Sequence, residues 1–239
     1  MEEKFGASTE PTSCRVVTWN CQKGIDKAWG TLTSLEADIV VIQEVDSHTE
    51  HFALAMGWSA IWKGTDPKGL AVIARPGLQL FNLEQSYPWS LPVRIEGAVA
   101  LTVLGFWAMT PSRVGRSYTE QAIATFNEID ALQSPIVFAG DFNAWNQPQH
   151  LNFVKALEEK GLVSAYHKFN QKPKGGETHP TYYHQYRLDQ PFHCDFVFVP
   201  DVVELRGTSV GTFEAFPGSK ISDHVPVVVD LILLKPPLC

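Results

Sequence analysis

Short apolar runs separated by polar turns recur along the chain, and several of them end abruptly on a polar or charged residue. Runs of this length that are rich in Val, Ile and Phe are typical of buried strands. They predict strands over 15–20, 38–44, 69–75, 78–83, 98–107, 135–141, 181–186, 194–199 and 225–234. The small gaps between the runs from 69 to 107 indicate hairpins.

Helical patterns lie between some of these runs. The composition of 28–35 and 149–160 favours helices, and 118–132 carries apolar residues at helical spacing. These residues are Ala122, Ile123, Phe126, Ile129 and Leu132. Because strands outnumber helices, and close hairpins occur together with helical crossovers, we expect an α/β or α+β fold built around two packed sheets.

The chain reads as one domain. Residues 1–13 have the composition of a disordered lead-in, and no repeat, low-complexity block or linker divides the part from 14 to 239. The first residues lack the basic start and apolar stretch of a secretory signal, and no apolar run is long enough to span a bilayer. We therefore expect a cytoplasmic protein without a membrane segment.

Composition and charge limit the function classes. Hydrophobic residues make up 44% and charged residues 19%, which excludes a mostly disordered chain. The net charge of -7 argues against a broad basic face for duplex DNA, but a hydrolase needs only a few phosphate contacts. The four cysteines have unrelated spacings, so we expect buried thiols rather than disulfides or a zinc site. The oligomeric state stays open.

The candidate chemistry lies at the ends of five predicted strands. Their terminal side chains are of kinds that coordinate metal or phosphate: Asn20, Glu44, Asp141 with Asn143, Asp195, and Asp223 with His224. Burying a carboxylate is costly unless it is paired or metal-bound, so repeated carboxylates at the ends of apolar runs indicate a shared hard cation. Oxygen ligands suit Mg²⁺ or Mn²⁺ better than zinc, and phosphate is then the natural substrate group.

Six motifs carry a resemblance to a known family. In chain order they are Trp19-Asn20-Cys21, Gln43-Glu44, Gly69-Leu-Ala-Val, Gly140-Asp-Phe-Asn143, Asp195-Phe-Val-Phe and Ser222-Asp-His224. Together they resemble the DNase I-like endonuclease/exonuclease/phosphatase superfamily over about 15–231, and the ordered combination is more specific than any single motif. The resemblance implies a four-layered α/β sandwich, with two central mixed sheets flanked by helices and the active site at one edge.

The same resemblance implies roles for the metal and the water. Glu44 corresponds to the principal carboxylate on the metal, and Asn20 and Asp223 lie near the ion or a second one. Asp141 corresponds to the group that orients or deprotonates the attacking water, and Asn143 to a donor to the phosphate. The cofactor implied is Mg²⁺ or Mn²⁺.

His224 and Asp195 correspond to a pair at the scissile phosphate. A carboxylate that accepts from one ring nitrogen favours the imidazolium, which can donate to a phosphate oxygen and stabilise the transition state. The run from Asp141 to Asn143 could instead be a simple turn before the next helix, but that interpretation would leave Glu44 and Asp223 unexplained. Water is expected to attack directly, without a covalent enzyme intermediate.

One position departs from the family pattern. Many members carry a His or Tyr where this chain has Ala108 or Met109, so a second general acid is missing or comes from elsewhere. Four polar residues that are near in sequence are candidates to replace it: Tyr118, Arg116, Arg113 and Glu96.

Further residues are candidates for substrate contact. Thr181 and His193 lie in the segment before the strand of Asp195, where Tyr182 and Tyr183 are placed to stack on bases. Trp145 follows Asn143, and packing under the metal site or stacking on a base are both open. The loop with Lys172, Lys174 and two glycines either covers substrate or is a solvated tip.

The function expected is a divalent-metal phosphodiesterase, foremost a nuclease that hydrolyses DNA or RNA. Two alternatives stay open. One is a phosphatase or phosphodiesterase for a small phosphorylated molecule, since loops set the substrate within such a fold. The other is a catalytically inactive nucleic-acid-binding member, which the change at Ala108 motivates.

Overall fold

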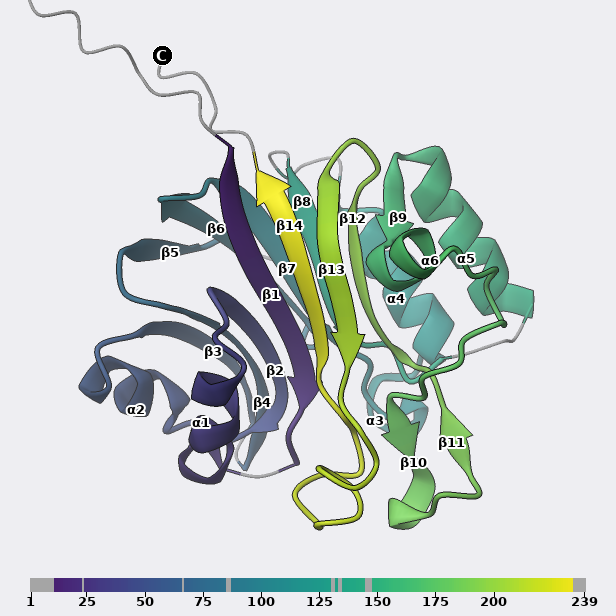
Figure 1. Ribbon diagram of the computed structural model, residues 1–239, viewed down its shortest axis with the longest axis horizontal. Helices are drawn as coiled ribbons and strands as arrows, with labels where there is room; N and C mark the ends of the chain where they lie inside the picture. Colours follow the sequence, from purple (N-terminus) through teal and green to yellow (C-terminus); the bar gives the residue numbers. More distant parts are fainter. Residues whose placement is uncertain are drawn as a thin grey trace, which may run out of the picture.

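The computed structural model describes residues 11–233, except for 23, 66, 85–86, 130–131, 133–134 and 145–147. Within this part, two six-stranded mixed sheets pack against each other and helices lie on their outer faces (Figure 1). The predicted four-layered sandwich is confirmed.

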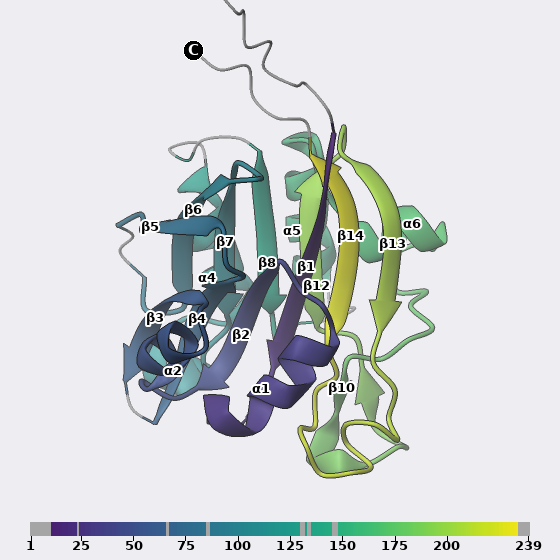
Figure 2. The same ribbon diagram turned by 60° about the vertical axis from the view of Figure 1, so that its left-hand side comes forward.

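The first sheet has the strand order β13-β14-β1-β2-β4-β3, and both ends of the described chain contribute to it. Its strands are β1 (Thr12–Asn20), β2 (Ile39–Val45), β3 (Ser59–Thr65), β4 (Lys68–Ala74), β13 (Glu204–Val210) and β14 (Val227–Leu233). Strands β1 and β2 are parallel, and the other neighbours are antiparallel. Helices α1 (Ile25–Ser34) and α2 (Thr49–Ala55) lie against the outer face (Figure 2).

The second sheet has the order β5-β6-β7-β8-β12-β9. Its strands are β5 (Leu78–Asn82), β6 (Ser90–Gly97), β7 (Leu101–Trp107), β8 (Ile136–Asp141), β9 (Leu162–Ser164) and β12 (Asp195–Pro200). Only β7 and β8 are parallel among its described pairs. The remaining α-helices are α3 (Pro111–Val114), α4 (Tyr118–Phe126), α5 (Pro148–Glu159) and α6 (Ala165–Asn170). A small separate hairpin pairs β10 (Tyr182–Tyr183) with β11 (Pro191–Phe192).

Side chains alternate between the two faces of each strand, and this alternation builds three apolar layers. In β1, Val16 faces the other sheet, while Val17 and Trp19 pack under α1. The two sheets pack tightly at Gly105, where an added Cβ would lie 3.3 Å from methyl groups of Val41 and Val72. The third layer joins the second sheet to α4 and α5 through phenylalanines.

Most predicted strands exist, but some boundaries and elements differ. Strand β1 begins at Thr12, inside the segment expected to be a lead-in, because Thr12 and Ser13 pair with the end of β14; residues 1–10 lie outside the described part. The helix expected over 118–132 ends at Phe126, and only two residues of the run 181–186 form a strand. A 3₁₀ turn over His184–Tyr186 with positive φ at Gln185 ends that strand early.

Two predictions about the whole chain can be compared with the described part. Cys14, Cys21 and Cys194 are free and buried, as expected, and Cys239 lies outside the described residues. Every described helix is too short or too polar to traverse a lipid bilayer.

Candidate active site

The predicted site residues converge because the strands that carry them end at the same edge of the sandwich. Asn20 and Gln43 are register partners at the ends of the parallel pair β1 and β2. Asp141, at the end of β8, is paired with Asp195, at the start of β12. By strand alternation, Asp141 and Asp195 point toward the other sheet, on the same side as their neighbours in the core between the sheets.

Asp141 is the most enclosed carboxylate of the site. Its Oδ2 accepts hydrogen bonds from Nδ2 of Asn20 at 3.0 Å and Nδ2 of Asn143 at 3.1 Å. Its Oδ1 accepts from the backbone N–H of Asn143 at 2.9 Å, and Asn143 adopts a left-handed conformation with φ 48°. Burial raises the pKa of Asp141 to about 7, although His224 and these donors act in the opposite direction. The carboxylate is therefore oriented by donors and poised to accept a proton near neutral pH.

The backbone at position 140, directly before Asp141, requires a glycine. Its φ is +156°, and an added Cβ would lie only 1.8 Å from the backbone oxygen of Phe106 on the neighbouring parallel strand. Only glycine lets β8 approach β7 this closely. The close approach fixes the backbone immediately before Asp141.

His224 lies between two carboxylates. Its Nδ1 is 2.9 Å from Oδ2 of Asp195, and its Nε2 is 3.9 Å from Oδ2 of Asp141. Burial alone would lower the pKa of His224, but Asp195 and Asp141 raise it to about 10. His224 is therefore an imidazolium at neutral pH, with Nδ1–H donated to Asp195.

Buried hydroxyls hold the two halves of this pair in place. Ser222 Oγ donates to the backbone oxygen of Asn20 at 2.7 Å and accepts from the backbone N–H of His224 at 3.0 Å. Thr181 Oγ1 accepts from the backbone N–H groups of Cys194 and Asp195, both at 3.0 Å. The serine of the Ser-Asp-His motif thus ties the histidine to β1.

Glu44 sits on an irregularity of β2. Its φ is +59°, and the pairing of β2 with β4 shifts register between Gln43 and Val45. A bulge of this kind turns a side chain away from the regular alternation, and positive φ at a non-glycine residue is typical of functional positions. The side chain of Glu44 is 17% exposed and forms an ion pair with Lys68 of β4.

Asp223 lies beside this group with an unsatisfied oxygen. Its Oδ1 is buried and accepts no hydrogen bond from any described residue; His224 Nε2 lies 4.0 Å away. Burial raises the pKa of Asp223, His224 lowers it, and Glu44 is close enough to raise it further. Two neighbouring carboxylates, one with a buried unpaired oxygen, fit a hard divalent cation.

A second set of possible ligand atoms is chemically less suited to a hard cation. Asp141, Cys194, Asp195 and His224 offer atoms within 4.8 Å of one another, all buried. Asp195 is already bound to the His224 ring, and burial raises the pKa of the Cys194 thiol well above its usual range. Because a protonated thiol is a weak ligand, the oxygen group of Glu44 and Asp223 fits magnesium better.

The structure also describes the position where the family pattern is broken. Ala108 is buried, and its backbone oxygen accepts from Nδ2 of Asn143 at 3.0 Å. Gln121 of α4 binds both backbone groups of Met109, at 2.8 and 2.7 Å. This segment therefore serves the site through its backbone, without a polar side chain of its own.

Tyr182 brings an aromatic hydroxyl to the same place. Its ring lies 4.6 Å from the ring of His224, and the two residues form an isolated antiparallel bridge. The hydroxyl is 2.8 Å from Nδ1 of His184. Burial, followed by the nearby carboxylates, raises the pKa of Tyr182 to about 12, so the phenol stays a donor.

The amino-acid sequence matches a family model over residues 17–224, and this model carries the description endonuclease/exonuclease/phosphatase family. The chain belongs to this family. The matched range begins in β1 and ends at His224, so it includes all seven residues expected to act on the metal, the water or the phosphate.

Individual relatives are distant in sequence. A UPF0294 protein of Vibrio cholerae is 24% identical over 92% of this chain and 78% of its own length. The AP endonuclease of Archaeoglobus fulgidus has a TM-score of 0.71 at 15% identity, over 93% of this chain and 100% of that one. The TDP2 protein of D. rerio, complexed with a single-strand DNA product, has a TM-score of 0.69 at 13% identity, over 92% and 99%. These structures establish the family fold for this chain.

Two further residues predicted to contact substrate, Tyr118 and Arg116, lie in different surroundings. Tyr118 lines a cavity of about 480 Å³ next to Asn143, at the start of α4. Arg116 lies over the ring of Tyr87 at 5.8 Å and is not among the residues that line this cavity. Tyr118 therefore shares this cavity with Asn143 of the candidate site.

Thr181 and His193 are not at a solvent-facing surface. Thr181 is fully buried and acts on the backbone of Asp195, so direct contact with substrate would need the segment to move. His193 is 7% exposed, and its Nδ1 is 2.7 Å from the backbone oxygen of His179 on the side of α6. Trp145 lies outside the described residues.

Three residues support the site without having been predicted to act in it. Lys68 pairs with Glu44, Gln22 accepts from the Tyr186 hydroxyl at 2.8 Å, and Ser222 links β1 to the segment before β14. Ser222 was visible as part of a motif. The other two had no signal, because their partners are remote in the chain or reached through a bulge.

Proposed function

We propose that this protein is a divalent-metal-dependent phosphodiesterase that hydrolyses nucleic acid. The observation that carries the proposal is the placement of His224 between Asp195 and Asp141, beside the carboxylates of Glu44 and Asp223. A protonated imidazole, an oriented carboxylate and a cation-binding pair are the groups that phosphoryl transfer to water requires.

Glu44 and Asp223 are the proposed carboxylate ligands of Mg²⁺ or Mn²⁺, with Asn20 beside them. Two observations support this assignment: Asp223 Oδ1 has no hydrogen-bond partner among the described residues, and Glu44 sits on the bulge of β2 with a positive φ. When bound, the ion would neutralise charge on the phosphoryl oxygens and lower the pKa of a bound water. Asn20 of the first sheet donates to Asp141 of the second.

The remaining residues have separable roles in the proposed reaction. Asp141 orients the attacking water and accepts its proton, which a pKa near 7 favours. Asn143 and the imidazolium of His224 donate to phosphate oxygens, and Asp195 holds the His224 ring. Tyr182, packed on His224, is a proposed additional donor, in place of the polar side chain that Ala108 does not provide.

Nucleic acid is the proposed substrate class. The AP endonuclease and the TDP2 complex with single-strand DNA support it by analogy of fold. The net charge of -7 favours a single-stranded or short substrate over a long duplex, because many phosphate contacts need many cations. The buried free thiols support a reducing compartment such as the cytoplasm as the proposed location.

The test combines a metal series with a substrate series. Purified protein is incubated with Mg²⁺, Mn²⁺ or EDTA and with bis-p-nitrophenyl phosphate, labelled single-stranded and duplex DNA, RNA, abasic DNA and phosphate monoesters. We expect metal-dependent cleavage of diesters, with the single strand cut fastest. Cleavage of monoesters alone would replace the nuclease by a phosphatase, and no turnover with any ion would favour an inactive binding protein.

A further inference from the structure

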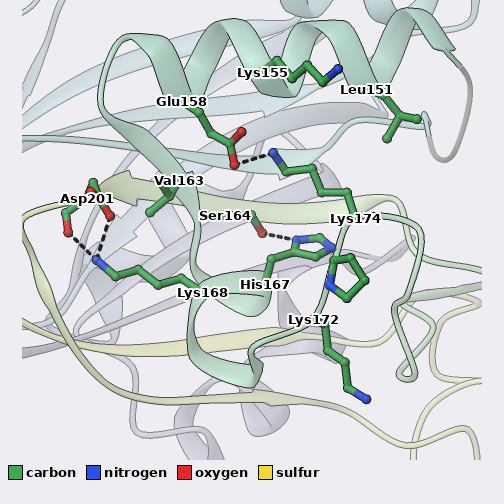
Figure 3. Close-up of a pocket in the computed structure, with 11 residues that line it drawn as sticks. Leu151, Lys155, Glu158, Val163, Ser164, His167, Lys168, Lys172, Lys174 and Asp201 are labelled. Carbon is green, nitrogen blue, oxygen red and sulfur yellow. Dashed lines mark hydrogen bonds and ion pairs between the residues drawn. The ribbon is translucent and has the colours of Figure 1, made fainter.

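A cationic pocket lies away from the site just described. It is bounded by α5, β9, α6 and the loop after α6, and has a volume of about 550 Å³ (Figure 3). Four of the chain's twelve lysines line it: Lys155, Lys168, Lys172 and Lys174. They come from three separate segments, so the gathering of charge is a property of the fold and not of one basic run.

The lysines outnumber the carboxylates that line this pocket. Lys174 pairs with Glu158 at 2.5 Å and Lys168 with Asp201 at 3.0 Å. Lys155 and Lys172 have no ion-pair partner among the described residues, and their amino groups stand at opposite edges of the pocket in Figure 3. In a chain with a net charge of -7, this local excess of positive charge is suited to an anionic ligand.

A buried histidine, His150, lies underneath this pocket. A small inner cavity shares Ser164, His167 and Lys174 with the pocket and reaches His150. His150 is 3% exposed, and neither ring nitrogen has a hydrogen-bond partner among the described residues. The inner cavity, of about 10 Å³, holds roughly one water-sized atom, so an oxygen of a ligand or a single water can reach the ring.

The lining also suggests the chemistry of the ligand. Ammonium groups are compact charges that bind phosphate from several directions, whereas flat carboxylates are matched better by arginine, which this lining lacks. Leu151, Val163 and Pro173, with the lysine stems, add apolar surface. The two ion pairs involve partly exposed groups, so exchanging a carboxylate for a ligand phosphate requires little energy.

We propose that this pocket is a second ligand site, which binds a phosphate group carried by a nucleotide, either free or within a strand. The base and sugar would lie against the apolar side chains, and the phosphate between the lysines. Two connections join the pocket to the candidate active site: α5 begins four residues after Ala144, and the loop of Lys172 and Lys174 leads to Tyr182.

Binding is measured by isothermal titration calorimetry in EDTA, so that no metal-dependent turnover occurs. The probes are ADP and a short single-stranded oligodeoxynucleotide. Lys155→Glu and Lys172→Glu are compared with Lys27→Glu, an exposed lysine of α1 with the same charge change. We expect both pocket variants to bind about tenfold more weakly and the Lys27 variant to stay within about twofold of the wild type.

The two probes identify the source of the phosphate. Weakened binding of ADP assigns the pocket to a free nucleotide, and weakened binding of the oligonucleotide alone assigns it to a strand. A His150→Leu variant, which removes the unpaired ring nitrogens, is expected to weaken the same probe. Failure of the wild type to bind either probe, or unchanged affinity in both lysine variants, would overturn the proposal whether or not the protein proves to be a nuclease.

Discussion

Asp141 is the residue at which the two sheets of the site meet. It belongs to the second sheet, yet it accepts from Asn20 of the first sheet and faces the ring nitrogen of His224. Its charge is balanced between burial, which favours the neutral acid, and donors, which favour the carboxylate. A group held in this balance can exchange a proton at little energetic cost, which is the property that a base for water needs.

Replacing either member of this contact should abolish most of the activity. We expect Asp141→Ala and His224→Ala each to lower turnover of the diester reporter by at least about 100-fold, because both act on the transition state. His51→Ala, at an exposed histidine of α2, should keep wild-type turnover. Circular dichroism melts must show that the fold is intact, and wild-type rates in either site variant would remove the mechanism.

Lys68 bears on how strongly the proposed site binds its metal. Its ammonium pairs with Glu44, so it competes with a cation for the same carboxylate. Lys68→Met should therefore lower the Mg²⁺ concentration for half-maximal activity by up to about fivefold, the range expected for an exposed ion pair. The same substitution at Lys27 serves as control, and a higher Mg²⁺ requirement in Lys68→Met would mean that the lysine assists the metal site.

At the scale of elements, the pair β7 and β8 controls where Asp141 lies. Gly140→Ala would bring a methyl group onto the backbone oxygen of Phe106 at a positive φ. We expect a loss of about 3 kcal/mol or more in unfolding free energy, together with lost activity, measured by urea denaturation. Gly30→Ala on α1, where nothing lies within 4 Å of the added methyl group, should instead be up to about 1 kcal/mol more stable.

The feature of the fold that the sequence predicted best was the end of each buried strand that carries a site residue. Buried strands such as β2 and β8 are continuous apolar runs, and the polar residue that ends each run marks the edge of the sheet. Strands β6 and β13 gave no such run, because Arg94 and Arg206 interrupt them with charges. Their place in the sheets depends on partners that are remote in the chain.

The sequence predicted those site residues whose role belongs to a single motif. It did not predict contacts that form only when separate segments pack against each other. The order of the motifs singled out Asp141 and His224. The contact of Tyr182 with His224, 42 positions later, arises only when the segment of β10 pairs beside the Ser-Asp-His motif. The burial of Thr181 and His193 likewise follows from tertiary packing, which local composition does not encode.

For the whole molecule, buried His150 links stability to pH. Burial lowers the pKa of His150 to about 4, while in the unfolded chain the pKa keeps its ordinary value of 6.5. Between these values the unfolded state binds more protons, so the stability that is present above pH 6.5 is lost as the pH falls toward 4. We expect a loss of about 2 kcal/mol between about pH 7 and about pH 5, measured by urea denaturation.

A matched pair of variants separates this effect from general acid denaturation. His150→Leu should reduce the dependence on pH in this range, whereas His51→Gln at an exposed position should not change it. An unaltered pH profile in His150→Leu would show that another group is responsible. Glu177 acts only at lower pH: burial would raise its pKa, but hydrogen bonds from His167 and Gly175 lower it to about 2.

Strand β14 lies between β13 and β1, so the first sheet is complete only when this last strand of the described chain is in place. His224 arrives with that strand. During synthesis on the ribosome, the segments that carry Asp141 and Asp195 emerge before His224 does. The proposed site can therefore assemble only after β14 has emerged, and until then the edge of β1 that β14 covers lacks its neighbour in the sheet.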